Sequence, residues 1–367
     1  MRKRLFVIVL VSILTFISYG PESRAQEKSE KTLTVNVDFS GVEMFLELTA
    51  LLEKDKEPTR EQWNALFATP GYAVLIRREF QNQDFFIDRF KLAFMPSLQK
   101  ELETQLQEES GFRAQFLPHY VRARKERRII EDAVKELKNL SFVQTAVEEA
   151  RKYLPDFELE SYPPVSFVIF GPDARGYVPV VLDIFYTLER KEFLKTFVAH
   201  EFHHYYRSFF YDFGQDQQIL WVINQIQGEG IADQINVGEW FHDKTLYAEV
   251  SQNGRNKAYL EWYVKSPEII REMDRLFSAM YDFPEKKGTL GAELQDIIPL
   301  SGHPTGFYMA NLIIEQLGEN VLIEDVKNPF AFFRHYQDAA VKKGGDTSSL
   351  SEKSIQFILS LEKRYIR

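Results

Sequence analysis

The sequence contains no cysteine among its 367 residues. This absence excludes disulfide bonds, zinc sites built from thiolates, and a lipid anchor attached to cysteine. An excess of positive charge is also lacking, since 45 Lys and Arg stand against 54 Asp and Glu. An acidic chain of this kind is a poor partner for nucleic acid or for an anionic membrane surface. The composition is otherwise that of a globular protein with one large domain or two modest ones.

Long apolar runs are scarce, and the one at the N-terminus is short. A basic start at Arg2 to Arg4 precedes an apolar stretch from Leu5 to Tyr19 and small residues at Ser23 and Ala25. This order predicts a secretory signal peptide over residues 1–25. An uncleaved membrane anchor is the alternative, although the run falls short of the ~20 residues that a spanning helix needs. An exported protein without cysteine is expected to be a bacterial periplasmic or secreted protein.

Residues 26–160 are expected to form a helical N-terminal region. Segments such as VEMFLELTALLEKD and ERRIIEDAVKELKNL carry apolar residues at three- and four-residue spacings, which indicates packed amphipathic helices. This region could be a separable cap or part of one body with the residues that follow.

The sequence pattern changes after Pro163 and Pro164. VSFVIF, residues 165–170, and YVPVVLDIF, residues 177–185, are rich in β-branched and aromatic residues and flank the turn-forming GPDARG, which predicts two strands. Pro179 has no N–H to donate to a neighbouring strand, so we expect the second strand at the edge of the sheet. The remaining chain returns to helical spacing. The predicted fold class is therefore α+β, predominantly helical with one small sheet over residues 161–367.

Residues 197–210, FVAHEFHHYYRSFF, hold three of the seven histidines. His200, Glu201 and His204 form the pattern H-E-x-x-H within a segment of helical apolar spacing. Two histidines four residues apart lie on one side of a helix and can both reach one ion at the ~2.0–2.1 Å of Zn–N bonds. Glu201 lies about 100° round the helix axis, where it can reach a metal-bound water. The pattern predicts the site of a metal-assisted hydrolase.

Catalytic zinc sites usually take three protein ligands and leave one position to water. The stretch QGEGIADQI offers a third ligand in Glu229, and Asp233 follows one helical turn later. A carboxylate at Asp233 could accept the proton of a ligating histidine and orient its ring. The alternative is that both acids are exposed helix charges, but the surrounding helix is strongly apolar, and buried carboxylates need partners.

HEFHH followed by GEGIADQ resembles the gluzincin branch of the zincin metallopeptidases, and the match spans about residues 197 to 236. The resemblance implies Zn²⁺ bound by His200, His204 and Glu229, with Glu201 as the general base that activates a zinc-bound water to hydrolyse a peptide bond. It also implies a zincin-like fold in which the strand from Val178 to Asp183 runs along the bound peptide. The tract SGHPTGFYMANLI further resembles a bacterial family of zinc-dependent peptidases. The interval between His204 and Glu229 is longer than in the better-known gluzincins.

Peptide hydrolysis also needs a donor for the negative oxygen of the tetrahedral intermediate. In SGHPTGFYMANL the candidates are His303 and Tyr308, beside a helix start set by Pro304; the alternative is a turn followed by a core aromatic. His203 is expected to be a flanking or surface residue, because its ring points away from the two ligands; the alternative is a contact with substrate. The other histidines discussed, His119, His242 and His335, are expected to be structural or exposed.

Three functions fit these features. The first is an exported zinc peptidase that acts on peptides or proteins. The second is a zinc-binding or peptide-binding envelope protein on the same scaffold without turnover. The third is a helical envelope protein in which HEFHH is an ordinary helix face. None of the three has nucleic acid as a partner, and none has a membrane span once the signal peptide is removed.

Overall fold

The segments with helical apolar spacing before residue 152 are helices in the computed structural model of the chain. The structure describes residues 34–80, 82–108, 114–138, 142–210, 218–252 and 254–366, so the predicted signal peptide lies outside the described residues. The helices of this first part are α1 (Ser40–Leu52), α2 (Arg60–Phe67), α3 (Pro70–Leu75), the π-helix η1 (Ile76–Phe80), α4 (Asp84–Phe94), the 3₁₀ turn η2 (Pro96–Leu98), α5 (Gln99–Glu108), α6 (Phe116–Lys125), α7 (Arg127–Leu137) and α8 (Phe142–Arg151).

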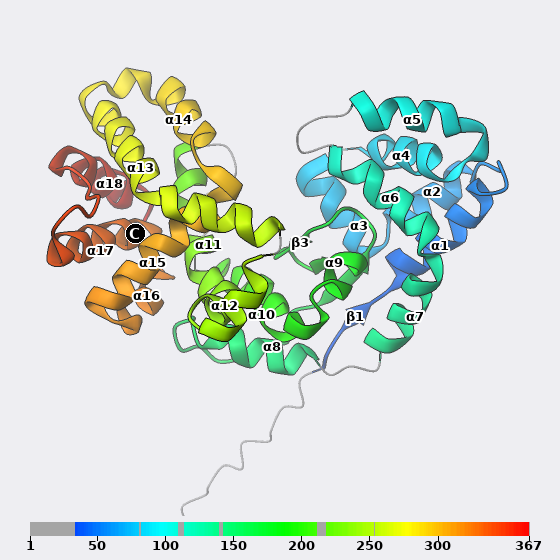
Figure 1. Cartoon of the computed structure of the whole chain (residues 1–367), viewed down its shortest axis with the longest axis horizontal. Coiled ribbons are helices and arrows are strands. Elements are labelled where there is room, and N and C mark those ends of the chain that lie inside the picture. Colours follow the sequence, from blue (N-terminus) through cyan, green and yellow to red (C-terminus); the bar gives the residue numbers. More distant parts are fainter. Residues whose placement is uncertain are drawn as a thin grey trace, which may run out of the picture. The chain divides into compact units, whose positions relative to one another are not determined.

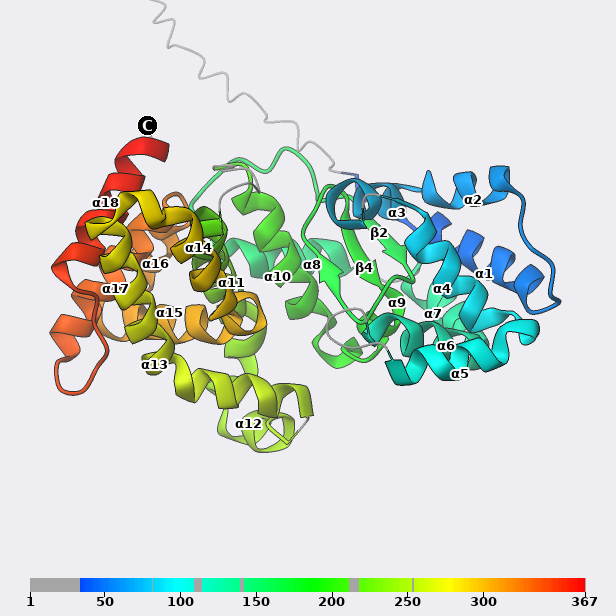
Figure 2. The same ribbon diagram turned by 90° about the horizontal axis from the view of Figure 1, so that it is seen from above.

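A small sheet lies between helices α1 to α7 and the second part of the chain (Figures 1 and 2). Its strands are β1 (Val37–Asp38), β2 (Val165–Val168), β3 (Ala174–Arg175) and β4 (Val180–Asp183), in the order β1-β2-β4-β3. β1 and β4 both pair parallel to β2, and β3 pairs antiparallel to β4. β2 and β4 are buried throughout, as expected for strands covered on both faces. The combination of many helices and one small sheet confirms the α+β class.

The prediction that the strand after Pro179 lies at the sheet edge is wrong. β4 begins at Val180 and lies between β2 and β3. Pro179 lies immediately before the strand, so its missing N–H removes no hydrogen bond from the ladder. The two-residue strand β3 occupies the edge instead, and the chain leaves β4 through Asp183, whose carboxylate caps α9 (Ile184–Leu188).

The second part of the described chain is helical. It consists of η4 (Lys191–Phe193), α10 (Leu194–Arg207), α11 (Gln218–Phe241), α12 (Lys244–Val250), α13 (Gly254–Asp282), η5 (Pro284–Lys286), α14 (Lys287–Asp296), η6 (Pro299–Gly302), α15 (His303–Leu317), α16 (Glu319–Asp325), α17 (Pro329–Lys343) and α18 (Glu352–Tyr365). α10 packs between α8 and α11, and α11 packs in turn on α15 (Figure 1). These four helices carry or support the candidate site.

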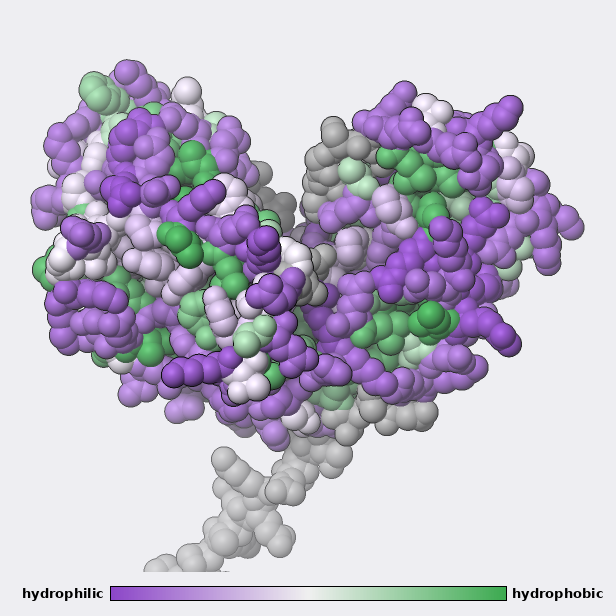
Figure 3. Space-filling view, viewed as in Figure 1, coloured by the Kyte–Doolittle hydropathy of each residue, from purple (hydrophilic) through white to green (hydrophobic). Residues whose placement is uncertain are grey.

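One continuous apolar core joins residues from both parts of the described chain. Phe39, on the N-terminal side, stacks on Phe167 of β2 with ring centroids 4.8 Å apart. The outer face seen in Figure 3 is mainly hydrophilic, with apolar residues in separate groups. Over the described residues, the helices are too short or too polar to span a bilayer. The boundary near residue 160 between a helical region and a peptidase region stays a prediction.

Candidate metal centre

The H-E-x-x-H pattern lies on α10, as the apolar spacing predicts. Phe197, Val198 and Phe202 are buried on this helix, and their packing fixes the direction of the side chains between them. His200 and His204 follow one another by one turn, and their Nε2 atoms are 3.1 Å apart. His200 is only 4% exposed, so its ring is removed from bulk water. The helix therefore presents two imidazole nitrogens to one small volume.

Glu229 of the neighbouring helix α11 faces the same volume. Its Oε2 lies 3.0 Å from Nε2 of His204 and 3.2 Å from Nε2 of His200. In a tetrahedral zinc site, bonds of ~2.0–2.1 Å place the ligand atoms about 3.3 Å apart. The separations between the three atoms here are close to that distance. Two nitrogens and one carboxylate oxygen are also a donor set that zinc accepts. The residues present fit a zinc ion with three protein ligands.

The charges at this centre act on one another strongly. Burial alone would lower the pKa of His200, but the carboxylates of Glu229, Asp233 and Glu201 outweigh it and raise the pKa to about 9. Burial would raise the pKa of Glu229, but the imidazoles of His204, His303 and His200 hold it well below its usual range. Without a metal, the attraction between the Glu229 carboxylate and the protonated His200 imidazole therefore holds the centre together. A divalent cation can take the place of the proton.

Asp233 and Asn236 contact the His200 ring at its other nitrogen, Nδ1. Nδ1 of His200 is 3.2 Å from Oδ1 of Asn236 and 3.4 Å from Oδ1 of Asp233. Both oxygens are acceptors, so Nδ1 carries the proton and Nε2 keeps its lone pair for a metal. Asn236 lies two helical turns after Glu229 on the same face of α11. The sequence interpretation missed this residue, although its seven-residue spacing from Glu229 could have indicated it.

His303 joins the centre from the start of α15. Its Nε2 lies 3.3 Å from Oε2 of Glu229, and its Nδ1 lies 3.1 Å from both oxygens of Asp233. The ring stacks on that of His200 at 17° with centroids 5.5 Å apart. Burial would lower the pKa of His303, but Glu229 and Asp233 raise it to about 10. Asp233 therefore contacts His200 and His303 together, whereas the sequence suggested support for a single ligand.

Two features outside the sequence motifs hold His303 and Asp233 in place. The Tyr259 hydroxyl donates to Oδ2 of Asp233 at 2.7 Å. Leu300, Ser301 and Gly302, just before His303, all have positive φ, at 47°, 54° and 95°. Such backbone is costly for residues with a β-carbon, about 1 kcal/mol or more each, and is often found at functional sites. The Tyr259 contact has no local sequence signal, because it depends on tertiary structure, whereas Gly302 is a residue type that favours positive φ.

Tyr308, the other predicted donor, lies elsewhere. It follows His303 by five residues, about 140° round the axis of α15. Its ring packs against Tyr263 at a centroid distance of 5.6 Å, and within the described part of the chain its hydroxyl makes no hydrogen bond to the metal centre. Of the two candidates, the structure brings only His303 to Glu229.

Glu201 lies on α10 between the two histidines and is 8% exposed. Within the described part of the chain, its carboxylate accepts no hydrogen bond. Burial raises its pKa, and the nearby histidines His200 and His204 oppose this only in part. A carboxylate with a raised pKa beside a metal site is suited to accept and return a proton.

The prediction that His203 is a flanking or surface residue is wrong. Its side chain is fully buried, and Nε2 lies 3.1 Å from the backbone oxygen of Tyr153. α8 covers this face of α10, so a ring that points away from the ligands enters the core rather than solvent. Burial lowers the pKa of His203 well below its usual value, which keeps the ring neutral. Its role is packing against the segment after α8.

The comparisons with known proteins give one family. The sequence model of the DUF5700 family, described as "Putative zinc dependent peptidase", matches residues 63–345, which is most of the chain. This range includes every residue of the metal centre. Neither the curated proteins nor the solved structures contain a match to the chain.

Proposed function

The chain belongs to the DUF5700 family, and from that premise we propose that it is a zinc-dependent peptidase whose metal is held by His200, His204 and Glu229. One observation carries this proposal above the others. The carboxylate of Glu229, 25 residues after His204, converges on both imidazoles at 3.0 and 3.2 Å. Bound zinc would supply Lewis acidity and lower the pKa of a coordinated water to about 7.

Glu201 is the proposed general base. Its carboxylate takes a proton from the attacking water and then gives it to the leaving amine, which requires a pKa closer to neutrality than that of an exposed glutamate. Burial supplies this shift. The lack of a competing hydrogen bond from the other described residues leaves both oxygens available for the proton.

His303 is the proposed donor to the developing negative oxygen, in preference to Tyr308. In the metal-free protein it is protonated at neutral pH, because Glu229 and Asp233 raise its pKa to about 10. Asp233 fixes its ring through Nδ1, so Nε2–H can donate towards the centre. A preorganised donor of this kind contributes about 10²- to 10³-fold to turnover.

The location and the substrate are part of the proposal. The basic and apolar start of the sequence supports export to the periplasm or the exterior. Peptides or proteins are the proposed substrates, and the acidic composition makes nucleic acid an unsuitable partner. We further assign residues 161–367 to a gluzincin-like peptidase region preceded by a helical region.

Replacing Glu201 by Gln tests the proposed mechanism. The wild-type protein should contain about one equivalent of zinc and cleave an unfolded protein substrate such as casein. Glu201→Gln should keep the zinc and lose about 10²- to 10⁴-fold of the hydrolysis. Glu192→Gln, an exposed glutamate just before α10, is the matched control and should behave like wild type.

The alternatives predict different results. A non-catalytic zinc- or peptide-binding protein would hold zinc but show no hydrolysis that depends on Glu201. Less than about a tenth of an equivalent of zinc after refolding with zinc would exclude the metal centre itself.

A further inference from the structure

The segment Asp173–Tyr177, which includes β3, lies directly on the catalytic helix. A β-carbon added to Gly176 would fall 2.6 Å from Cβ of His204 and 2.9 Å from the backbone oxygen of Glu201. It would also lie 3.5 Å from Oε2 of Glu201. Only glycine fits this contact without a shift, so the backbone at Gly176 forms a wall beside the proposed general base.

One residue of the N-terminal helical region holds both neighbours of Gly176. Glu79 accepts a bidentate pair from Arg175, with Nε–Oε1 at 2.6 Å and Nη2–Oε2 at 3.2 Å. The hydroxyl of Tyr177 donates to the same carboxylate at 2.9 Å. Arg175 also pairs with Asp173 at 2.5 Å. The side chains of Arg175 and Glu79 are only 19% and 20% exposed, so this ion pair is better protected from water than a surface pair.

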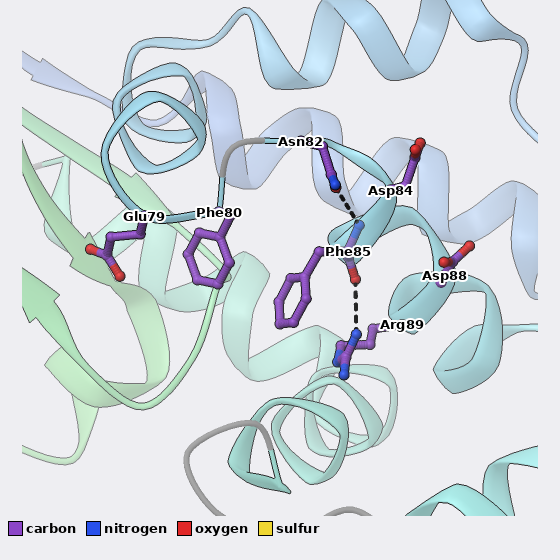
Figure 4. A pocket seen from close by; sticks show the side chains of 7 residues that line it. All are labelled: Glu79, Phe80, Asn82, Asp84, Phe85, Asp88 and Arg89. Atoms are coloured by element: carbon purple, nitrogen blue, oxygen red, sulfur yellow. Dashed lines mark hydrogen bonds between the residues drawn. The ribbon is translucent and has the colours of Figure 1, made fainter.

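The position of Glu79 is set by an uncommon backbone element. It lies in the π-helix η1, which directly follows α3, and single π-helical turns are frequently found at functional sites. Arg78 of the same turn lies 5.9 Å from the ring centroid of Tyr177. Glu79 also lines a surface cavity of about 490 Å³ with Phe80, Asn82, Asp84, Phe85, Asp88 and Arg89. In Figure 4 its carboxylate points away from these residues, towards the strands drawn in green.

We propose that Glu79 is a positioning residue of the peptidase, which holds Arg175 and Tyr177 so that Gly176 stays against Glu201 and His204. The N-terminal helical region thereby contributes to turnover without touching substrate. The catalytic part of this inference rests on the proposed function, whereas the anchoring of the segment can be tested without turnover.

Glu79→Gln should loosen the segment, because the neutral amide weakens the pairing with Arg175 while keeping the shape of the side chain. In the metal-free variant, hydrogen exchange at the amides of residues 174–177 should be at least about tenfold faster than in wild type. The zinc-loaded variant should keep about one equivalent of zinc, and kcat should fall about tenfold or more while KM changes less.

Asp84→Asn is the matched control. Asp84 lines the same cavity, carries the same charge and makes one exposed ion pair with Arg60 at 3.8 Å. This control should leave exchange and kcat within about twofold of wild type. Tyr177→Phe removes one hydrogen bond and no charge, so it should act in the same direction more weakly. The effects of Tyr177→Phe and Glu79→Gln should combine less than multiplicatively, since both act on one contact.

Unchanged exchange at residues 174–177 in Glu79→Gln would overturn the anchoring. Faster exchange with unchanged kcat would overturn the link to turnover. A wild-type protein without hydrolysis would instead contradict the proposed function, and the exchange measurement would still decide whether Glu79 holds the segment.

Discussion

Gly230 and Gly306 meet where α11 crosses α15. A β-carbon at Gly230 would lie 2.4 Å from the backbone carbonyl carbon of Gly306, and one at Gly306 would lie 2.1 Å from the backbone oxygen of Ile226. No side chain separates the two helices at this point. Because Gly230 follows Glu229 and Gly306 lies one turn after His303, the crossing places these two functional side chains beside each other.

Gly230→Ala should therefore disturb the metal centre. The added methyl group must push the helices apart, and overpacking of this kind costs about 1–3 kcal/mol. In the metal-free protein, unfolding should begin at a lower urea concentration, and zinc should bind more weakly. Gly288→Ala in α14 is the control, because a β-carbon there meets nothing within 4 Å and alanine favours the helix by about 1 kcal/mol. Equal stability of the two variants would contradict the close crossing.

Asp233→Asn should lower the affinity for zinc about 10- to 100-fold. The neutral amide would lose the ion pairs with His200 and His303, and its nitrogen would face a donor. Zinc affinity, measured by competition with a chelating dye, checks this. Asp132→Asn is the control, since Asp132 forms an exposed pair with Lys135 and its side chain is 76% exposed. An affinity equal to that of the control would mean that Asp233 does not orient the ligand.

Zinc binding should become tighter as the pH rises from about 6.5 to 8.5. In the metal-free state, the pKa of His200 is raised to about 9, so His200 is protonated at neutral pH and must lose its proton to bind zinc. The apparent affinity should increase about tenfold per pH unit for each proton released. Calorimetric titration at pH 7 in buffers of different ionisation enthalpy measures this release.

The stability of the metal-free protein should change in the opposite direction. A pKa raised above the unfolded value of about 6.5 contributes stability that is complete below that pH and is lost as the pH rises through about 9. The melting temperature of the metal-free protein should thus fall between about pH 6.5 and pH 9. The rise in melting temperature on adding zinc should become larger over the same pH range. His204→Ala, which lacks one proposed ligand, should show no increase with zinc. A zinc affinity that does not change with pH would contradict the role of His200.

The parts of the site that could be predicted from sequence depend on helical periodicity. His200, Glu201 and His204 lie within one helical turn, and Glu229 and Asp233 lie one turn apart on the next long helix. Residue spacing alone therefore fixed how each group is arranged. The convergence of the two groups, which is tertiary, was inferred from the usual number of protein ligands at catalytic zinc and from the resemblance.

The parts that could not be predicted depend on contacts between distant segments. Tyr259 of α13 and Gly176, between β3 and β4, contact the centre, while Glu79 of η1 contacts the neighbours of Gly176, and no local pattern distinguishes these three residues. The prediction for His203 was wrong for the same reason, because the sequence pattern of α10 does not reveal that α8 covers the face on which His203 lies. The error at Pro179 concerned the start of the strand, since the proline lies just before it.

β1 consists of two residues, yet it pairs with β2 across more than a hundred positions of sequence. One edge of the sheet is therefore supplied by a strand that precedes all the helices of the described chain. The ribosome must synthesise all the residues between β1 and β2 before the two strands can pair. Closing so long a loop slows folding. A fragment that contained only residues 161–367 would lack β1, one edge of the sheet, and should therefore be less stable than the whole chain.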